Sequence, residues 1–278
     1  MRSRDLSRQA ATAQTMYRNC RLCEHHCAVD RSAGERGVCH AGTGARVWRY
    51  TVDYAEEAPL APSLLVYLSG CDLRCAFCIS EANAFDPQRG RLLTPEWLDE
   101  ILQWGQLQGA RTLQWLGGEP TIHLPAILAA LDGCARQLPV VWKSDFYGTP
   151  ECWRLLEGVV DTYVPDFKFG NNACARRIAG VERYIEVVTR NLLDTAARAP
   201  LLVRHLLLPG HFDCCFRPIV LWLQRFLPQV PLSIRDGYLP RWQARRHVEL
   251  AVPVERALSA RAFRLATEHG LHLVEGFL

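Results

Sequence analysis

Residues 64–78 read LLVYLSGCDLRCAFC, an apolar run followed by three cysteines at the spacing C-x3-C-x2-C. The run at residues 64–69 predicts a buried strand, and Gly70 predicts the start of a loop. Three thiolates on one short loop can hold three irons of a [4Fe-4S] cube, whereas clusters that only carry electrons usually have four cysteines. The fourth iron is then open to a small molecule, which indicates chemistry at the cluster.

Two other interpretations of Cys71, Cys75 and Cys78 are weaker. A disulfide network is disfavoured because residues 1–13 are polar and Arg-rich and show no secretory signal. We therefore expect a reducing, cytoplasmic compartment, in which cysteines are metal ligands or catalytic groups. A zinc site is also disfavoured, because zinc loops usually show C-x2-C pairs.

The composition excludes several function classes. The chain has 278 residues, 49% of them apolar and 22% charged, as in an ordinary globular protein. Its net charge of +3, from 32 basic and 29 acidic residues, is too small to indicate a nucleic-acid partner. No run approaches the roughly 20 apolar residues that a membrane span needs. We expect neither nucleic acid nor membrane as a partner.

Strand and helix signals alternate from residue 64 onward. Strands are predicted at residues 64–69, 112–116, 140–144, 162–164, 201–208 and 229–234, with helices at 94–108, 124–136, 150–157, 184–197, 218–226 and 254–269. Repeated βα units favour an α/β fold with a parallel sheet, and six units fit a partial (β/α)6 barrel. The cysteine loop and the polar motifs at residues 117–120, 144–145 and 166–168 all follow strands. We therefore expect them to meet at one end of the barrel.

A second set of cysteines precedes the barrel: Cys20, Cys23, Cys27 and Cys39, at the spacing C-x2-C-x3-C-x11-C. Residues 20–50 are too poor in apolar side chains to fold alone, so a metal is the natural staple. Zinc and an auxiliary iron–sulfur cluster fit these cysteines equally well. We expect residues 1–50 to form a Cys-rich metal-binding segment and residues 51–278 the barrel, with 51–63 as a linker.

Five further cysteines remain, and we interpret them as small apolar core side chains. They are Cys134, Cys152, Cys174, Cys214 and Cys215. The adjacent pair at 214–215 follows the loop signal Pro209-Gly210 and is the least typical of a core.

At these residues the chain resembles the radical S-adenosylmethionine (SAM) enzymes. The resemblance covers residues 64–235 and rests on the C-x3-C-x2-C loop, with the aromatic Phe77 before its last cysteine, and on Gly117-Gly118-Glu119-Pro120 after the next strand. The chain is most similar to relatives of the pyruvate formate-lyase activating enzyme, in an uncharacterised subgroup with a Cys-rich N-terminal segment. The stretches that support this subgroup are residues 17–31, 34–39, 161–168 and 203–210.

The resemblance implies that SAM binds the open iron and is cleaved reductively to a 5'-deoxyadenosyl radical. That radical would abstract hydrogen from a protein or peptide, including the installation of a glycyl radical, with a flavodoxin or ferredoxin as electron donor. One alternative is radical modification of a small metabolite. Another, of a different class, is a non-catalytic iron–sulfur or zinc protein, against which the Gly-Gly-Glu-Pro motif argues.

The resemblance also implies which residues contact SAM, although it singles out no catalytic residue. The expected residues are Gly117, Gly118, Glu119, Pro120, Ser144, Asp166, Lys168 and His205. The glycines would let the backbone approach SAM, whereas Glu119 could instead cap a helix and Asp166–Lys168 could be a buried ion pair. Arg204 and His205 alternate along a strand, so at most one faces the barrel.

The chain departs from the family pattern at two places near the expected substrate mouth. Ile79-Ser80-Glu81 stands where an Asn-bearing stretch is typical, and Asp236-Gly237-Tyr238 where Asp-Gln-Tyr is typical. Lys143 also replaces an acid that some relatives carry, which disfavours a cation site. These departures leave the substrate open.

Overall fold

The buried run that begins at residue 64 forms β2 (Ser63–Leu68), at the centre of a six-stranded sheet in the computed structural model, which describes residues 2–55 and 57–274. The strand order is β3-β1-β2-β4-β5-β6. β2, β4 (Thr112–Gly117), β5 (Val140–Ser144) and β6 (Thr162–Pro165) are parallel. β1 (Arg46–Asp53) and β3 (Arg91–Leu92) add an antiparallel edge.

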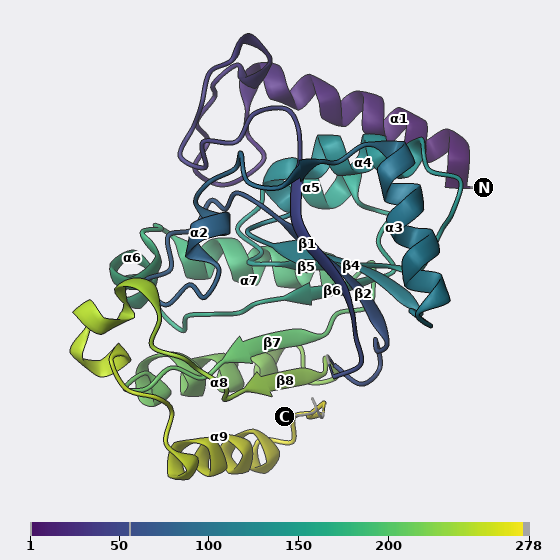
Figure 1. Cartoon of the computed structure of the whole chain (residues 1–278). Coiled ribbons are helices and arrows are strands. Elements are labelled where there is room, and N and C mark those ends of the chain that lie inside the picture. Colours follow the sequence, from purple (N-terminus) through teal and green to yellow (C-terminus); the bar gives the residue numbers. More distant parts are fainter. Residues whose placement is uncertain (1, 56, 275–278) are drawn as a thin grey trace.

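A second sheet continues the wall beyond β6. It consists of the parallel strands β7 (Val203–Leu206) and β8 (Leu232–Arg235). Single bridges from Tyr163 to Leu201 and from Asp166 to Arg204 join β6 to β7, and the strands curve as one surface in Figure 1. The predicted partial (β/α)6 barrel is therefore confirmed.

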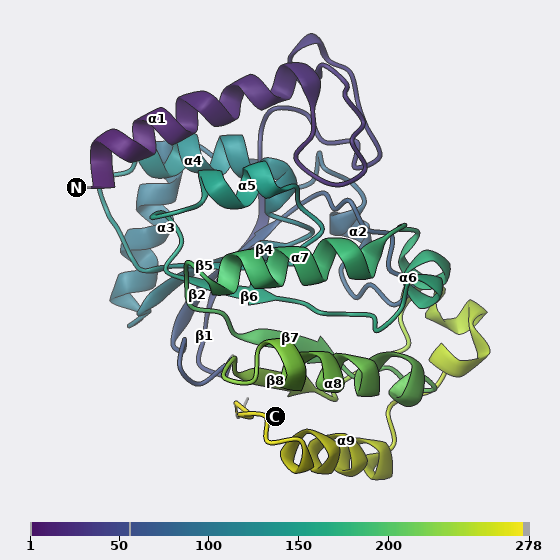
Figure 2. The ribbon, with the colours of Figure 1, turned by 180° about the vertical axis from the view of Figure 1, so that it is seen from behind.

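Helices follow the parallel strands and cover their outer face, as Figure 2 shows for α7 and α8. The predicted helix that follows Thr94 begins at Pro95, and the Thr94 hydroxyl caps it by accepting a hydrogen bond from Trp97 N at 3.2 Å. Two short helices, at Glu81–Ala84 and Asn172–Ala179, were not predicted. The helices are α2 (Glu81–Ala84), α3 (Pro95–Leu107), α4 (Leu124–Asp132), α5 (Pro150–Leu155), α6 (Asn172–Ala179), α7 (Tyr184–Ala196), α8 (Arg217–Phe226) and α9 (Arg256–Glu268).

The N-terminal segment packs into the same core as the barrel. Helix α1 (Arg2–Thr15) lies along α4 (Figure 1), and its Ala10 and Ala13 are buried in the shared apolar cluster. Tyr17 is also buried, and its hydroxyl donates to Thr43 O at 2.7 Å. Among the helices that the structure describes, none is long and apolar enough to cross a membrane.

The expectation that residues 51–63 form a linker is wrong at both ends, since Ser63 already belongs to β2. Residues 51–53 belong to β1, which pairs with β2 from Val47 opposite Leu68 to Asp53 opposite Ser63. Apolar and β-branched side chains in Arg46–Asp53 favour a strand, and β2 offers it a free edge. The proposed domain boundary at residue 50 therefore falls inside a strand.

Candidate active site at the carboxyl ends of the parallel strands

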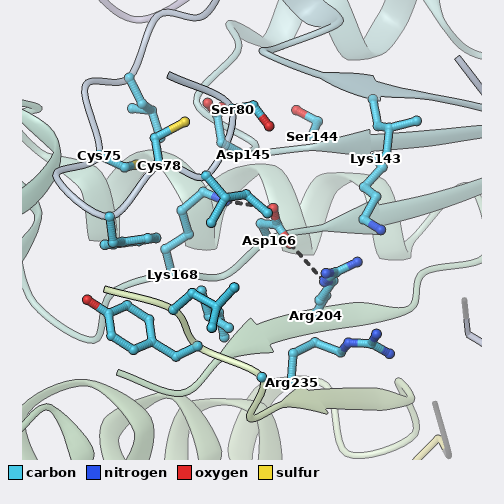
Figure 3. Close-up of a pocket in the computed structure, with 18 of the residues that line it drawn as sticks. Cys75, Cys78, Ser80, Lys143, Ser144, Asp145, Asp166, Lys168, Arg204 and Arg235 are labelled. Carbon is cyan, nitrogen blue, oxygen red and sulfur yellow. Dashed lines mark hydrogen bonds and ion pairs between the residues drawn. The ribbon is translucent and has the colours of Figure 1, made fainter. Parts of the chain in front are cut away.

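A cavity of about 1010 Å³ opens at the carboxyl ends of the parallel strands. Cys71, Cys75 and Cys78 line one wall of it, and the turn after β4 lines the next, with Gly117 and Gly118. Figure 3 shows Asp166 and Lys168 at the same cavity, facing the cysteine loop. The structure thus brings together the motifs that the strand-end argument predicted.

The cysteine loop is held from behind by α6. Arg74 N and Ala76 N donate to Ala179 O and Ile178 O, at 2.9 and 2.8 Å. Phe77, between the last two cysteines, is buried and contacts Phe169, with ring centroids 6.4 Å apart. Helix α6 therefore fixes the backbone on which the three thiols stand.

Gly117 and Gly118 join the end of β4 to the base of this loop. Gly118 N donates to Leu68 O, and Glu119 N donates to Gly70 O, both at 2.8 Å. A Cβ on Gly118 would lie 1.7 Å from Gly70 O, and Gly117 has a φ of +121°. The glycines line the cavity as expected, but neighbouring backbone already requires them, independently of any approach of SAM.

Alanine at Gly118 is therefore expected to lower the free energy of unfolding by more than about 3 kcal/mol, because its Cβ would overlap backbone that cannot move aside. Gly237→Ala is a matched control, since a Cβ there meets nothing within 4 Å; it should change stability by less than about 0.5 kcal/mol. Urea unfolding of both variants measures the difference. Equal stabilities would show that the joint does not need glycine.

Glu119 ties β4 to β5. Its carboxylate is 1% exposed and accepts hydrogen bonds from Thr121 N, Ser144 Oγ and Asp145 N at 2.8, 2.8 and 2.9 Å. Burial, and then the Asp145 carboxylate, raise the pKa of Glu119 to about 8. Two of the three donors belong to the end of β5, so the carboxylate links two strand ends, and the turn that follows it has no side-chain cap. Pro120 is not among the described residues that line the cavity.

Further carboxyl groups gather beside Cys71. Its sulfur and carboxylate oxygens of Asp72 and Asp145 all lie within 4.8 Å of one another. Burial, and then Glu119, raise the pKa of Asp72 to about 7, and burial followed by Asp72 raises the pKa of Asp145. Asp72 lies in the spacer of the C-x3-C motif, and no sequence pattern singled it out. The acids suit a cationic group such as an ammonium or a sulfonium.

Basic side chains line the opposite wall. Lys168 Nζ lies 2.6 Å from Asp166 Oδ2, and Arg204 Nε lies 3.7 Å from Asp166 Oδ1 (Figure 3). Burial alone would raise the pKa of Asp166, but Lys168 and Arg204 outweigh burial and lower it. Lys143 and Arg235 line the cavity as well. This wall suits a carboxylate or another anion.

Strand β7 presents Arg204, not His205, to the cavity. His205 is 1% exposed, its Nδ1 lies 2.7 Å from Phe167 O, and its ring packs on Phe216. It is not among the described residues that line the cavity. The alternation of side chains predicted that only one of the two would face inward, but the residue chosen for SAM was the one that packs behind the strand.

Burial lowers the pKa of His205 from 6.5 to about 4. The unfolded chain therefore binds the proton more readily, and stability falls as the pH drops below 6.5. At pH 5.5 this costs about 1.4 kcal/mol relative to neutral pH. Between pH 7.5 and 5.5 we expect the free energy of unfolding of His205→Gln to fall by about 1.4 kcal/mol less than that of the wild type. Urea unfolding of both proteins, in the same metal state, measures the difference. An identical pH dependence would mean that His205 is not a buried neutral imidazole.

The N-terminal cysteines lie beside the cysteine loop. His25 Nε2 lies 3.0 Å from Asp72 O, and Arg74 donates to Val38 O at 2.7 Å. Cys20, Cys23 and Cys39 are buried and Cys27 is half-buried. Among the described residues, the groups whose ligand atoms all lie within 4.8 Å include none of these four cysteines. Zinc or an auxiliary cluster at this segment stays a prediction.

Two sequence comparisons show which known proteins the chain is similar to. A model of the radical SAM superfamily matches residues 65–223. An uncharacterized protein of Methanocaldococcus jannaschii is 32% identical over 272 residues, which cover 94% of this chain and 78% of that protein.

Solved structures share the fold at low identity. Streptococcus suis SuiB bound to the precursor peptide SuiA is 12% identical with a TM-score of 0.53, over 73% of this chain and 46% of SuiB. HydG, a maturase of the [FeFe]-hydrogenase, is 13% identical with a TM-score of 0.53, over 76% of this chain and 50% of HydG. The chain thus spans about half the length of these two structures.

Proposed function

The chain belongs to the radical SAM superfamily, and we propose that it takes a hydrogen atom from a protein or peptide segment that docks at the mouth of its cavity. Membership confirms the resemblance and makes the protein an enzyme of this superfamily. A [4Fe-4S] cluster and the cleavage of SAM are general to the family: the cluster supplies an electron, and SAM yields methionine and a 5'-deoxyadenosyl radical. The substrate is the part that we propose.

The residues that line the cavity fit both groups. Cys71, Cys75 and Cys78 share one cavity wall and would hold the cluster. Glu119 and Asp145 line the cavity near Cys71 and would face the ammonium and sulfonium of SAM, while Lys168 and Arg204 would face its carboxylate. The buried walls would exclude water from the radical. The substrate would supply the hydrogen atom from one of its C–H bonds, and 5'-deoxyadenosine would be the product that carries it.

The observation that carries the substrate class is the apolar rim of the cavity. Ile79, Leu239 and Phe263 line it and are 71%, 51% and 38% exposed. Large apolar side chains gathered at an opening mark docking surfaces. The volume of about 1010 Å³ lies at the upper limit of the roughly 300–1,000 Å³ typical of small-molecule sites, which leaves room for a substrate residue beside SAM.

Two resemblances support a polypeptide substrate. SuiB has been solved with a precursor peptide bound, and the activating-enzyme relatives suggested by the sequence act on protein glycyl residues. Because of the resemblance to the activating-enzyme relatives, the proposal includes the installation of a glycyl radical. We further propose a flavodoxin or ferredoxin as electron donor, and zinc or an auxiliary iron–sulfur cluster at Cys20, Cys23, Cys27 and Cys39.

Deuterium transfer tests the substrate class. The reconstituted enzyme, SAM and dithionite are mixed anaerobically with extract from host cells grown in deuterated medium, divided by size into polypeptides and metabolites. We expect deuterated 5'-deoxyadenosine with the polypeptide fraction, and loss of the label after that fraction is digested with protease. Label from the metabolite fraction alone would identify a small-molecule substrate and overturn the proposal.

If the apolar rim binds the substrate, removing its exposed side chains should weaken binding of the polypeptide. Ile79→Ser combined with Leu239→Ser should raise the KM for the polypeptide fraction at least about tenfold, because two exposed apolar anchors of roughly 1 kcal/mol each are lost. Leu107→Ser is the matched control: Leu107 is 77% exposed at the end of α3 and does not line the cavity. An unchanged KM in the double variant would remove the rim from substrate binding.

A further inference from the structure

Four ligand atoms converge on one point outside the cavity. Cys174 Sγ, His211 Nδ1, Cys214 Sγ and Cys215 Sγ all lie within 4.8 Å of one another. His211 Nδ1 is 3.6, 3.3 and 3.6 Å from the sulfurs of Cys174, Cys214 and Cys215. Cys214 Sγ is 3.8 Å from Cys174 Sγ and 3.9 Å from Cys215 Sγ.

These separations are those of ligands around a single tetrahedral ion. With metal–sulfur bonds of about 2.3 Å and metal–nitrogen bonds of about 2.0–2.1 Å, ligand atoms lie roughly 3.5–3.8 Å apart. An iron–sulfur cluster would spread the same ligands over separate irons. Three thiolates and one imidazole form a closed Cys3His set, which is typical of structural zinc.

The backbone is shaped to bring these residues together. Cys214 and Cys215 lie in a π-helical turn, Phe212–Phe216, a rare conformation that is frequent at functional sites. A Cβ on Gly170 would lie 2.4 Å from Cys215 O, so glycine is needed for the two segments to approach. Asn171 caps α6 by accepting from Cys174 N at 2.8 Å and donates to Cys214 O at 2.7 Å.

The histidine also has the outer partner that a metal ligand requires. His211 is 3% exposed, and its Nε2 lies 3.5 Å from Glu249 Oε1. Glu249 is in turn paired with Arg177, which lies 3.3 Å from the same ring nitrogen. With Nδ1 on the metal, Nε2 carries the ring proton and would donate to the Glu249 carboxylate, while Arg177, which can only donate, would pair with that carboxylate and not with the ring.

We propose that Cys174, His211, Cys214 and Cys215 bind one structural zinc ion. The ion would tie α6 to the turn after β7, and Ile178 O and Ala179 O of α6 accept the backbone hydrogen bonds of the cysteine loop. Zinc would thereby fix the support of the Cys71–Cys78 loop from outside the cavity. The interpretation of Cys174, Cys214 and Cys215 as core side chains is replaced, whereas Cys152 is fully buried and remains one.

Metal analysis of single variants tests the site. Zinc and iron per chain are measured by mass spectrometry of the full-length protein, purified anaerobically, for wild type, Cys214→Ala and Cys134→Ala. We expect Cys214→Ala to lose one zinc per chain and Cys134→Ala to lose none. If Cys214→Ala loses a zinc ion that the double variant Cys20→Ala/Cys23→Ala retains, that ion belongs to this site and not to the N-terminal segment. The same zinc content in wild type and Cys214→Ala overturns the proposal.

A second measurement needs no variant and holds if Cys214→Ala fails to fold. Cys214 is exposed, so its thiol should react with iodoacetamide unless a metal holds it. Treating the wild-type protein with a zinc chelator should raise labelling of Cys174, Cys214 and Cys215 together, at least about tenfold, while Cys134 is unchanged. Labelling of Cys214 that is equally fast before and after chelation contradicts a bound ion.

Discussion

Alanine in place of Cys75 is expected to abolish the formation of 5'-deoxyadenosine from SAM and to remove the iron bound at the cavity. The thiol of Cys75 is buried in the cavity wall, and the two remaining cysteines of the loop cannot hold a cube that needs three protein ligands. The measurement is chromatography of 5'-deoxyadenosine after anaerobic reconstitution with iron and sulfide, followed by dithionite and SAM.

Cys134→Ala is the matched control. Cys134 is also a buried cysteine, but its thiol donates to Asp99 Oδ1 at 3.3 Å and it does not line the cavity. It should keep both iron and activity. Undiminished SAM cleavage by Cys75→Ala would exclude the C-x3-C-x2-C loop as the cluster site.

Metal content after removal of all three loop cysteines reports on the N-terminal segment. About four irons per chain remaining in the Cys71/Cys75/Cys78 triple alanine variant would mean an auxiliary cluster at Cys20, Cys23, Cys27 and Cys39. Two zinc ions per chain and no iron would mean a structural ion there, in addition to the one expected at Cys214, whereas a single zinc ion would leave these four cysteines without a metal.

Methionine in place of Lys168 is expected to lower both stability and SAM cleavage. Lys168 Nζ and Asp166 Oδ2 lie 2.6 Å apart, with the side chains only 19% and 28% exposed. Removing the ammonium leaves a largely buried carboxylate, which costs about 3 kcal/mol. Arg204 Nε, at 3.7 Å from Asp166, compensates for only part of this loss. Urea unfolding measures the stability.

The double variant Asp166→Asn/Lys168→Met separates binding of SAM from a structural ion pair. With neither charge present, stability should return to within about 1 kcal/mol of wild type. We expect SAM cleavage to stay at least about tenfold below wild type, because the groups that face SAM are gone. Recovery of activity together with stability would show that the pair serves only to hold β6 in place.

The barrel and the convergence of its motifs could be predicted because the carboxyl ends of the parallel strands can be recognised in the sequence. An apolar run that ends in a glycine and polar residues marks the carboxyl end of a parallel strand, and such ends meet. Gly117-Gly118-Glu119 and Asp166–Lys168 therefore reached the same cavity as the cysteine loop. The edge strand β1 was missed in part, because Pro59 and Pro62 made residues 51–63 look like a linker.

Other parts of the site depend on contacts that a linear pattern does not contain. Gly118 is required by the carbonyl of Gly70, 48 positions away in the chain. The choice of Arg204 over His205 follows from which side chain finds a partner, since Asp166 faces the arginine and Phe167 O the histidine. Cys174 and His211 come from separate βα units, so their approach could be seen only in three dimensions.

The most direct test of the account is the wild-type protein itself. After anaerobic reconstitution, the iron and sulfide that the wild type holds in excess of Cys75→Ala establish that the Cys71–Cys78 loop carries its cluster, and dithionite and SAM are then added. The account predicts 5'-deoxyadenosine and methionine in equal amounts. Intact cluster with no cleavage of SAM would contradict it.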